Sequence, residues 1–308
     1  MSNNFSDIFM QVIGAAQTIA ANEEIIPQQP EEKPLEQPQE EKQEFDVQAW
    51  KEEQQQIRNT VYDYLEEITS LLQAGEVDFL QYLNVQAHFM EYSVSNTLLI
   101  LAQNANAQKI GSAKFWHEKG ALLQKGARHI YILEKGTAYQ KRDGSISTNY
   151  EPRKMYDISQ TNVKVNTQPQ TFDQRTLLTG LIKDYPGKME IVADLSLPVV
   201  VKENQDILYR EGMSFDEGFT WLSYIIGRMA LTIEDTAKMN YKAWCISYLL
   251  CQKAGIPFQS AFFQENNSLL RADSPKAFRM ELKEIRQTAV TLYDQIQSAA
   301  DKEQQVTL

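Results

Sequence analysis

The sequence predicts an α+β fold, with an N-terminal α+β domain followed by a mainly helical one. Apolar residues recur at three- and four-residue spacing through long stretches of both halves. Two short β-rich runs lie on either side of an Asp-Gly turn signal in the first half. A proline-rich acidic stretch precedes both halves. With 308 residues, of which 43% are hydrophobic, the chain is long enough to bury two cores.

The first 45 residues are predicted to stand apart from the globular part. Apolar residues from Phe5 to Ile19 follow helical spacing, which predicts an amphipathic helix in segment 1–22. Residues 23–45 are rich in Glu, Gln and Pro, and such a segment buries too little apolar surface to become ordered. We therefore expect a disordered linker there. The helix, at residues 4–21, is expected either to dock on a protein partner or to cap the main body.

The first globular domain is predicted for residues 46–165. Its expected elements are a long helix that begins near Asp46, a helix at 78–91, a helix from Ser93 or Ser95 to Gln103, and strands at 128–133 and 155–158. A second domain is predicted for 170–270, followed by a C-terminal helix and tail at 271–308. The expected elements there are helices at 173–183, 216–231, 236–254 and 274–301, and strands at 189–192 and 207–210.

Charge is unevenly distributed along the chain. The net charge is −11, but residues 1–53 alone carry −9. Residues 108–154 hold ten Lys and Arg against four acidic residues. This asymmetry indicates an anionic partner for the segment 108–154, in spite of the acidic total.

Several classes of protein are disfavoured by what the sequence lacks. It has no secretory signal pattern and no apolar run long enough for a membrane span, so a cytoplasmic protein without membrane contact is expected. Cys245 and Cys251 lie six apart in one helical segment, a spacing that predicts buried, reduced thiols. No phosphate-binding glycine loop and no Cys/His nucleophile pair occurs, so nothing points to catalysis.

The basic segment contains the residue types that sequence-tolerant binding of single-stranded DNA requires, cations for phosphates and flat rings for bases. The cations are Lys109, Lys114, Lys119, Lys125, Arg128, Lys135, Lys141 and Arg142. The rings are Phe115, Trp116, His117, Tyr131 and Tyr139. Asn96 and Gln103 lie seven apart, on one helix face, as amide donors. Gly126 would let a phosphate approach backbone N–H groups.

Structural alternatives exist for each of these features. Trp116 is expected either to stack on a base or to lie in the core. Tyr92 and Asn96 are expected either to contact nucleic acid or to brace their helix against the sheet. The basic residues are expected to line one common channel, and a merely solvated surface is the alternative.

Four blocks of the first half occur in a specific order: 92–104 (YSVSNTLLILAQN), 115–120 (FWHEKG), the Lys125-Gly126 turn, and 155–161 (MYDISQT). In this order and spacing, residues 78–161 resemble the N-terminal single-stranded-DNA-binding domain of ArdC-type antirestriction proteins. The resemblance implies a DNA-binding protein of a mobile genetic element, in conjugation or antirestriction. The residues expected to bind DNA are Tyr92, Asn96, Gln103, Lys109, Lys114, Trp116, Lys119, Lys125 and Arg128.

Full-length members of that family continue into a zinc-peptidase-like (zincin) domain. Segments 215–231 and 240–256 resemble two helices of that domain. By position, the two metal-binding histidines fall on Tyr224 and Arg228, the glutamate base on Ile225 and the third ligand on Trp244. None of these side chains can play the family role, because zinc requires imidazole, thiolate or carboxylate donors. No histidine follows His129. We therefore expect an inactive peptidase-like domain with no metal and no cofactor.

Two other hypotheses stay open at this point. In one, the chain is an interaction protein that binds a protein partner through residues 4–21 and the inactive domain. In the other, a residual peptidase acts by a different mechanism.

Overall fold

The computed structural model describes residues 46–163, 172–258, 263 and 267–306. The chain divides into two units, Met1–Asn59 and Thr60–Leu308. The predicted helix at 1–22 and the predicted linker at 23–45 lie outside the described residues.

Helix α2 (Val47–Ala74) begins where the sequence predicts. The Asp46 carboxylate accepts hydrogen bonds from the backbone N–H groups of Gln48 and Ala49, at 2.9 and 3.0 Å, which caps the first turn. Residues 46–56 of the first unit are exposed. In the second unit, α2 buries a stripe at helical spacing, made up of Val61, Tyr64, Leu65, Ile68 and Leu72.

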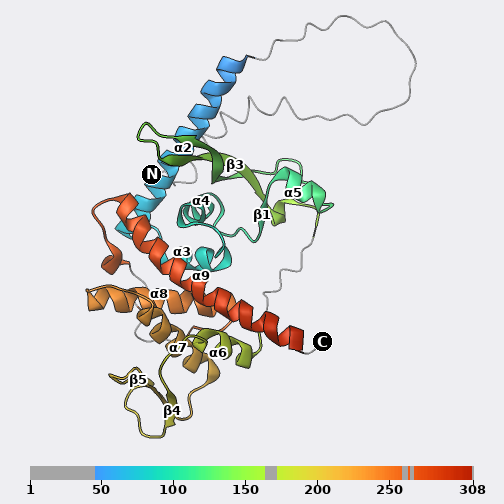
Figure 1. The fold of residues 1–308 in the computed structure, drawn as a ribbon. Helices are drawn as coiled ribbons and strands as arrows, with labels where there is room; N and C mark the ends of the chain where they lie inside the picture. Colours follow the sequence, from blue (N-terminus) through green and yellow to red (C-terminus); the bar gives the residue numbers. More distant parts are fainter. Residues whose placement is uncertain (1–45, 164–171, 259–262, 264–266, 307–308) are drawn as a thin grey trace, which may run out of the picture. The chain divides into compact units, whose positions relative to one another are not determined.

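The first half of the second unit combines helices with an antiparallel sheet (Figure 1). Its elements are α3 (Phe79–His88), α4 (Val94–Asn104), β1 (Ile110–Gly111), α5 (Ala113–Glu118), β2 (Ile130–Gln140), β3 (Ile146–Asp157) and a 3₁₀ turn (Ile158–Gln160). The strand order is β1-β3-β2. Asp78 caps α3, and Ser93, one of the two predicted starts, caps α4. The predicted Asp143-Gly144 turn joins β2 to β3, but both strands are longer than the predicted 128–133 and 155–158.

The second half is mainly helical. Its elements are α6 (Gln174–Ile182), β4 (Met189–Val192), β5 (Val199–Val201), β6 (Ile207–Arg210), α7 (Phe215–Met229), α8 (Thr236–Ala254), a 3₁₀ turn (Ser268–Leu270) and α9 (Pro275–Val306). In the small sheet, β6 lies between β4, to which it is parallel, and β5, to which it is antiparallel. The fold class is therefore α+β, as predicted. None of the described helices is long and apolar enough to cross a membrane.

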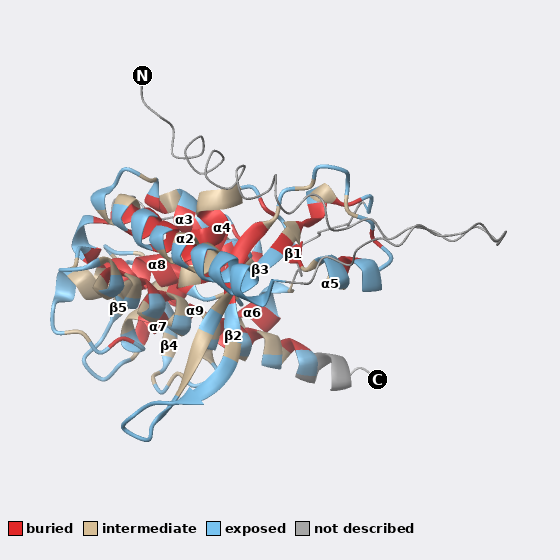
Figure 2. Cartoon of the chain, turned by 90° about the horizontal axis from the view of Figure 1, so that it is seen from above, coloured by how far each residue is buried: buried red, intermediate tan, exposed pale blue. Residues whose placement is uncertain are grey.

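Helix α8 holds a long run of buried residues in the second unit (Figure 2). Its residues 241–251 are all buried, and they include Cys245 and Cys251, which are free thiols as predicted. The helix joins the two predicted globular domains, at 46–165 and 170–270. The Tyr248 hydroxyl lies 2.6 Å from the Asn84 side-chain oxygen of α3, and the rings of Tyr241 and Phe79 have centroids 6.1 Å apart. Both contacts lie within the second unit, Thr60–Leu308.

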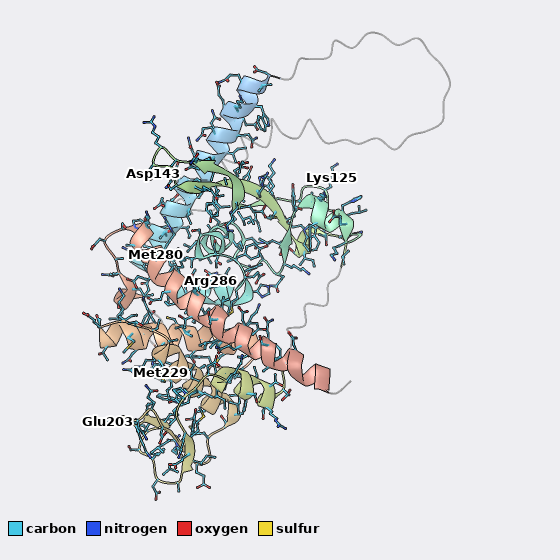
Figure 3. All side chains as sticks on the ribbon, in the orientation of Figure 1. Lys125, Asp143, Glu203, Met229, Met280 and Arg286 are labelled. Atoms are coloured by element: carbon cyan, nitrogen blue, oxygen red, sulfur yellow. The ribbon has the colours of Figure 1, made fainter. Side chains whose placement is uncertain are left out.

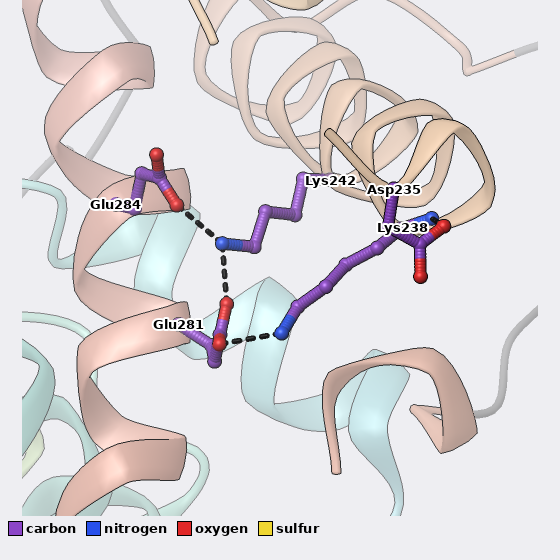
Figure 4. A network of polar contacts seen from close by, with 5 residues as sticks. All are labelled: Asp235, Lys238, Lys242, Glu281 and Glu284. Atoms are coloured by element: carbon purple, nitrogen blue, oxygen red, sulfur yellow. Dashed lines mark hydrogen bonds and ion pairs between the residues drawn. The ribbon is translucent and has the colours of Figure 1, made fainter. Parts of the chain in front are cut away.

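An ion network fixes α8 to α9 (Figure 4). The Lys242 side chain is only 2% exposed, and its ammonium contacts the carboxylates of Glu281, at 2.5 Å, and Glu284. Lys238 also contacts Glu281, at 2.5 Å. Burial tends to raise the pKa of Glu281, but the hydrogen bonds from Lys238 and Lys242 outweigh it, so this pKa lies below its ordinary value. The buried ammonium is thus matched by two carboxylates.

Candidate nucleic-acid interface

The two faces of the β2–β3 ribbon carry different side chains. Residues paired across antiparallel strands share a face, and successive residues of one strand alternate between faces. Tyr131 pairs with Lys154 and Lys135 pairs with Tyr150. The face that these pairs share is called the basic face below. Its cations and aromatic rings are His129, Tyr131, Lys135, Tyr150, Lys154 and Tyr156.

The opposite face holds the acidic residues of the ribbon. Glu134 pairs with Glu151 there, and Arg153 forms ion pairs with both, at 3.9 and 3.3 Å. Arg153 is thus neutralised by two carboxylates. Within β2 and β3 as the structure describes them, no acidic side chain lies on the basic face, where Lys135 and Lys154 are both exposed. The ribbon therefore separates its charges by face.

His129 belongs to the basic face as an uncharged ring. Its centroid lies 4.6 Å from the ring of Tyr131 and 6.3 Å from that of Tyr156. Burial, and then the neighbouring Lys154, lower the pKa of His129 to about 4. At neutral pH the imidazole is therefore neutral, and the positive charge at this end of the basic face comes from Lys154.

Five of the predicted cations lie near the end of the ribbon where β2 begins. All five are exposed: Lys109, Lys114, Lys119, Lys125 and Arg128. The Lys109 ammonium lies 6.0 Å from the centroid of the Phe115 ring, and Lys114 forms an exposed ion pair with Glu118 at 3.9 Å. Figure 3 shows Lys125 near α5 and Asp143 at the far end of the hairpin. The basic side chains are thus spread along the ribbon. The sequence had predicted that they line a single channel.

Gly126 confirms the predicted turn between Lys125 and Arg128. Its φ of +82° lies in the left-handed region, which a side chain would strain. No atom lies within 4 Å of the position that a Cβ would take at this glycine. The backbone of this turn is therefore open on that side.

Trp116 lies in the core, and the prediction that it stacks on a base is wrong. It is 3% exposed, and its indole N–H donates a hydrogen bond of 2.8 Å to the backbone oxygen of Tyr156. Its ring also meets Phe115 edge-on, with centroids 5.0 Å apart. Tyr131, another predicted ring, is only 8% exposed. Neither ring has a face free for stacking on a base.

Asn96 and Gln103 lie on one face of α4, as their spacing predicts, but they bond to the edge of β2. The Asn96 amide exchanges two hydrogen bonds with the backbone of Leu133, at 2.8 and 3.0 Å. The Gln103 amide does the same with Tyr131, at 2.8 and 2.9 Å. We therefore correct the predicted DNA contact of these amides to a structural role, which joins α4 to the sheet.

Tyr92 is half-buried and directly precedes Ser93, the N-cap of α4. Its ring meets that of Phe89 edge-on at 5.7 Å. Burial, and then the charges of Glu91 and Glu134, raise the pKa of its hydroxyl. Two carboxylates nearby disfavour a phosphate at this position. The structure therefore favours the bracing role that the sequence left open.

Three members of the basic face, Lys154, Tyr150 and Tyr156, were missing from the predicted set. Tyr150 and Lys154 lie in the polar first part of β3, which the sequence did not predict as strand, whereas Tyr156 lies in the predicted strand 155–158. Alternation at 150, 152, 154 and 156 was the available signal. Pro152 weakened that signal, since proline is unusual within strands.

The four zinc-peptidase positions in the second half are filled by packing side chains. The Tyr224 and Trp244 rings stack with centroids 4.0 Å apart, and Ile225 is 5% exposed. The Arg228 guanidinium donates a hydrogen bond of 2.8 Å to the side-chain oxygen of Asn240. An aromatic stack with one cation offers no donor set for zinc, so these residues do not fit the metal that the resemblance implies. Among the described residues, no cluster of His, Cys, Asp and Glu could hold a metal ion.

No family model and no curated protein matches the sequence. Two solved structures of the antirestriction protein ArdC from plasmid R388 are similar to the chain, one metal-free and one Mn(II)-bound. They have TM-scores of 0.48 and 0.49 at 10% and 9% identity, and each match covers 77% of this chain and at least 97% of the other.

Proposed function

We propose that the chain binds single-stranded DNA, without sequence preference, along the basic face of the β2–β3 ribbon. The observation that carries this proposal is the separation of charge. Lys135 and Lys154 share one face with aromatic rings, while the acidic residues lie on the other. Binding of a single strand needs cations that follow the phosphates and rings on which bases stack.

Unpaired bases suit this surface better than a duplex does. Tyr150 is 43% exposed and Tyr156 is half-buried, so both rings offer some surface to a base. The bases of a duplex are already stacked on one another and present only their edges in the grooves. The exposed Lys125 and Arg128 would hold phosphates where the strand reaches the end of the ribbon.

The direct test is fluorescence polarisation with a labelled oligo-dT and a duplex of equal length, over a range of salt concentrations. We expect single-stranded DNA to bind more tightly, with an affinity that falls as salt rises. The double substitution Lys125→Glu, Arg128→Glu should weaken binding strongly. No binding at low salt, or binding that does not respond to salt, would remove the basis of the proposal.

A pair of neighbouring cations tests the choice of face. Lys154→Gln should weaken binding about three- to tenfold and reduce the salt slope by about 0.7, the value for one phosphate contact on a single strand. Arg153→Gln removes the same charge one residue away, on the acidic face, and should leave the affinity unchanged. Equal losses in the two variants would mean that charge acts regardless of face.

Two tyrosines of equal exposure test the stacking of bases. Tyr150 lies on the basic face, whereas Tyr139 pairs with Ser147 on the opposite one, and each is 43% exposed. Base–aromatic stacking contributes about 1–3 kcal/mol, so Tyr150→Ala should lower the affinity about tenfold. Tyr139→Ala is the matched control and should bind like the unchanged protein. The reverse order would place the DNA on the other face.

We also propose that the second half of the chain does not act as a zinc peptidase. Support comes from the side chains at the four family positions, since Tyr224, Ile225, Arg228 and Trp244 supply no imidazole or carboxylate. Elemental analysis of the purified protein should find no stoichiometric zinc or manganese. A stoichiometric metal that a chelator removes would overturn this proposal. The antirestriction setting that the sequence implies stays a prediction.

A further inference from the structure

The outer part of the β2–β3 hairpin, residues 135–150, is called the arm below. The α4 amides join β2 at Tyr131 and Leu133, before the arm begins. Figure 2 shows the arm largely exposed, whereas the start of β2 is buried. Ile146 is 79% exposed, and Lys135, Lys141 and Arg142 are exposed too. The arm therefore presents apolar and cationic side chains together.

The basic face continues along the arm to its tip. Ile146 and Thr148 alternate with Tyr150 on β3, so they share the face of Lys154. The tip is a well-formed turn, in which the Asp143 carboxylate accepts hydrogen bonds from the Ser145 backbone N–H and hydroxyl, at 2.9 and 2.6 Å. Lys141 follows Gln140, the partner of Ile146, so its side chain lies on the opposite face, and Arg142 lies in the turn itself. These two exposed cations thus flank the tip of the ribbon, at the end away from Lys125 and Arg128.

We propose that the arm is a second half-site for the same DNA strand, and that Lys141 and Arg142 hold phosphates there. This inference rests on the proposed function. Strand β2 has 11 residues, which at about 3.4 Å per residue span about 35 Å. One strand of duplex DNA advances about 3.4 Å per nucleotide, so roughly ten nucleotides reach from one cation group to the other, and fewer when the strand is stretched. A longer strand occupies both half-sites, and a short one occupies either alone.

The test compares oligo-dT of about 6 and 20 nucleotides, lengths that bracket this span. Both are labelled and measured by fluorescence polarisation with the full chain. For the unchanged protein we expect the 20-mer to bind at least tenfold more tightly than the 6-mer, because a second contact on the same strand is intramolecular. The variant Lys141→Gln, Arg142→Gln should lose most of this gain. It should also lower the salt slope for the 20-mer by about 1.4, the value for two phosphate contacts.

Two further variants make the outcomes decisive. The control variant Lys183→Gln, Lys276→Gln removes the same charge from exposed positions, at the end of α6 and on α9. It should change the affinity for neither oligonucleotide. Ile146→Ser tests the apolar contact and should weaken binding of the 20-mer more than that of the 6-mer. If the arm variants keep the full gain with length, or weaken both lengths equally, the second half-site is refuted while single-strand binding stands. If the unchanged protein binds neither oligonucleotide, the proposed function itself fails, and the arm's role with it.

Discussion

Replacement of both Glu281 and Glu284 by glutamine is expected to lower the free energy of unfolding by about 3 kcal/mol. The physical reason is the position of Lys242, whose side chain is 2% exposed and whose ammonium contacts both carboxylates. Removal of the partners of a buried charge costs about 3–5 kcal/mol, and the glutamine oxygens recover a small part as hydrogen-bond acceptors. Urea unfolding followed by circular dichroism measures the change.

In the same network, removal of the buried lysine should lower stability less than removal of its two carboxylate partners. Lys242→Met removes the buried charge and fills a similar volume, while Glu281 keeps its contact with Lys238. This variant should lose about 1 kcal/mol or less, because no buried charge is left without compensation: Glu281 stays paired with Lys238, and Glu284 is 42% exposed to water. Glu118→Gln, at the exposed pair with Lys114, is the surface control and should change stability by about 0.5 kcal/mol or less. If Lys242→Met cost as much as the double glutamine variant, the buried charge would not be the cause.

The pH dependence of stability has a definite sign here. The folded pKa of Glu281 lies below its ordinary value, so its carboxylate stabilises the fold fully above the unfolded pKa of about 4.3. This stability is lost as the pH falls through the lower, folded pKa. Stability of the unchanged protein should thus decline in acid below about pH 4.3, and Glu281→Gln should decline less steeply there. Identical acid profiles would show that Glu281 does not contribute.

Helix positions were predictable because local chemistry determines them. The side chains of Asp46, Asp78 and Ser93 accept hydrogen bonds from free backbone N–H groups at the positions where the helices begin. Pro275 at the first position of α9 and Gly255 at the end of α8, with φ of +70°, act in the same local way. Such signals need no knowledge of the tertiary fold.

The arm and the candidate interface were only partly predictable. Lys125, Arg128 and the Asp143-Gly144 turn could be found from sequence, since charge and turn chemistry are local. The middle of β2 and most of β3 could not, because an exposed arm has polar residues on both faces and shows no apolar alternation. The register then decides which side chains share a face. Pairing of Lys154 with Tyr131, not composition, separates it from Arg153.

Asn96 shows most clearly what the sequence leaves open. Its replacement is expected to cause the second large loss of stability. Helical spacing placed Asn96 and Gln103 on one face, but only tertiary structure shows that the face meets the edge of β2. Asn96→Leu keeps the branched shape of the side chain and leaves the backbone N–H and C=O of Leu133 without their partner. Because Asn96 is 8% exposed, water replaces these bonds poorly. Each buried group that loses its partner costs about 1–3 kcal/mol, so we expect a loss of about 3 kcal/mol.

Two comparisons separate this structural role from DNA binding. Gln103→Leu removes the equivalent pair of bonds to Tyr131 from a half-buried position, and should cost less than Asn96→Leu because water can reach part of that site. Under conditions where each variant is folded, both should bind oligo-dT like the unchanged protein, since neither amide faces the basic face. An Asn96→Leu protein that is fully stable but fails to bind DNA would return Asn96 to the interface. A loss of stability with intact binding leaves α4 as the support that holds β2, and with it the basic face, in place.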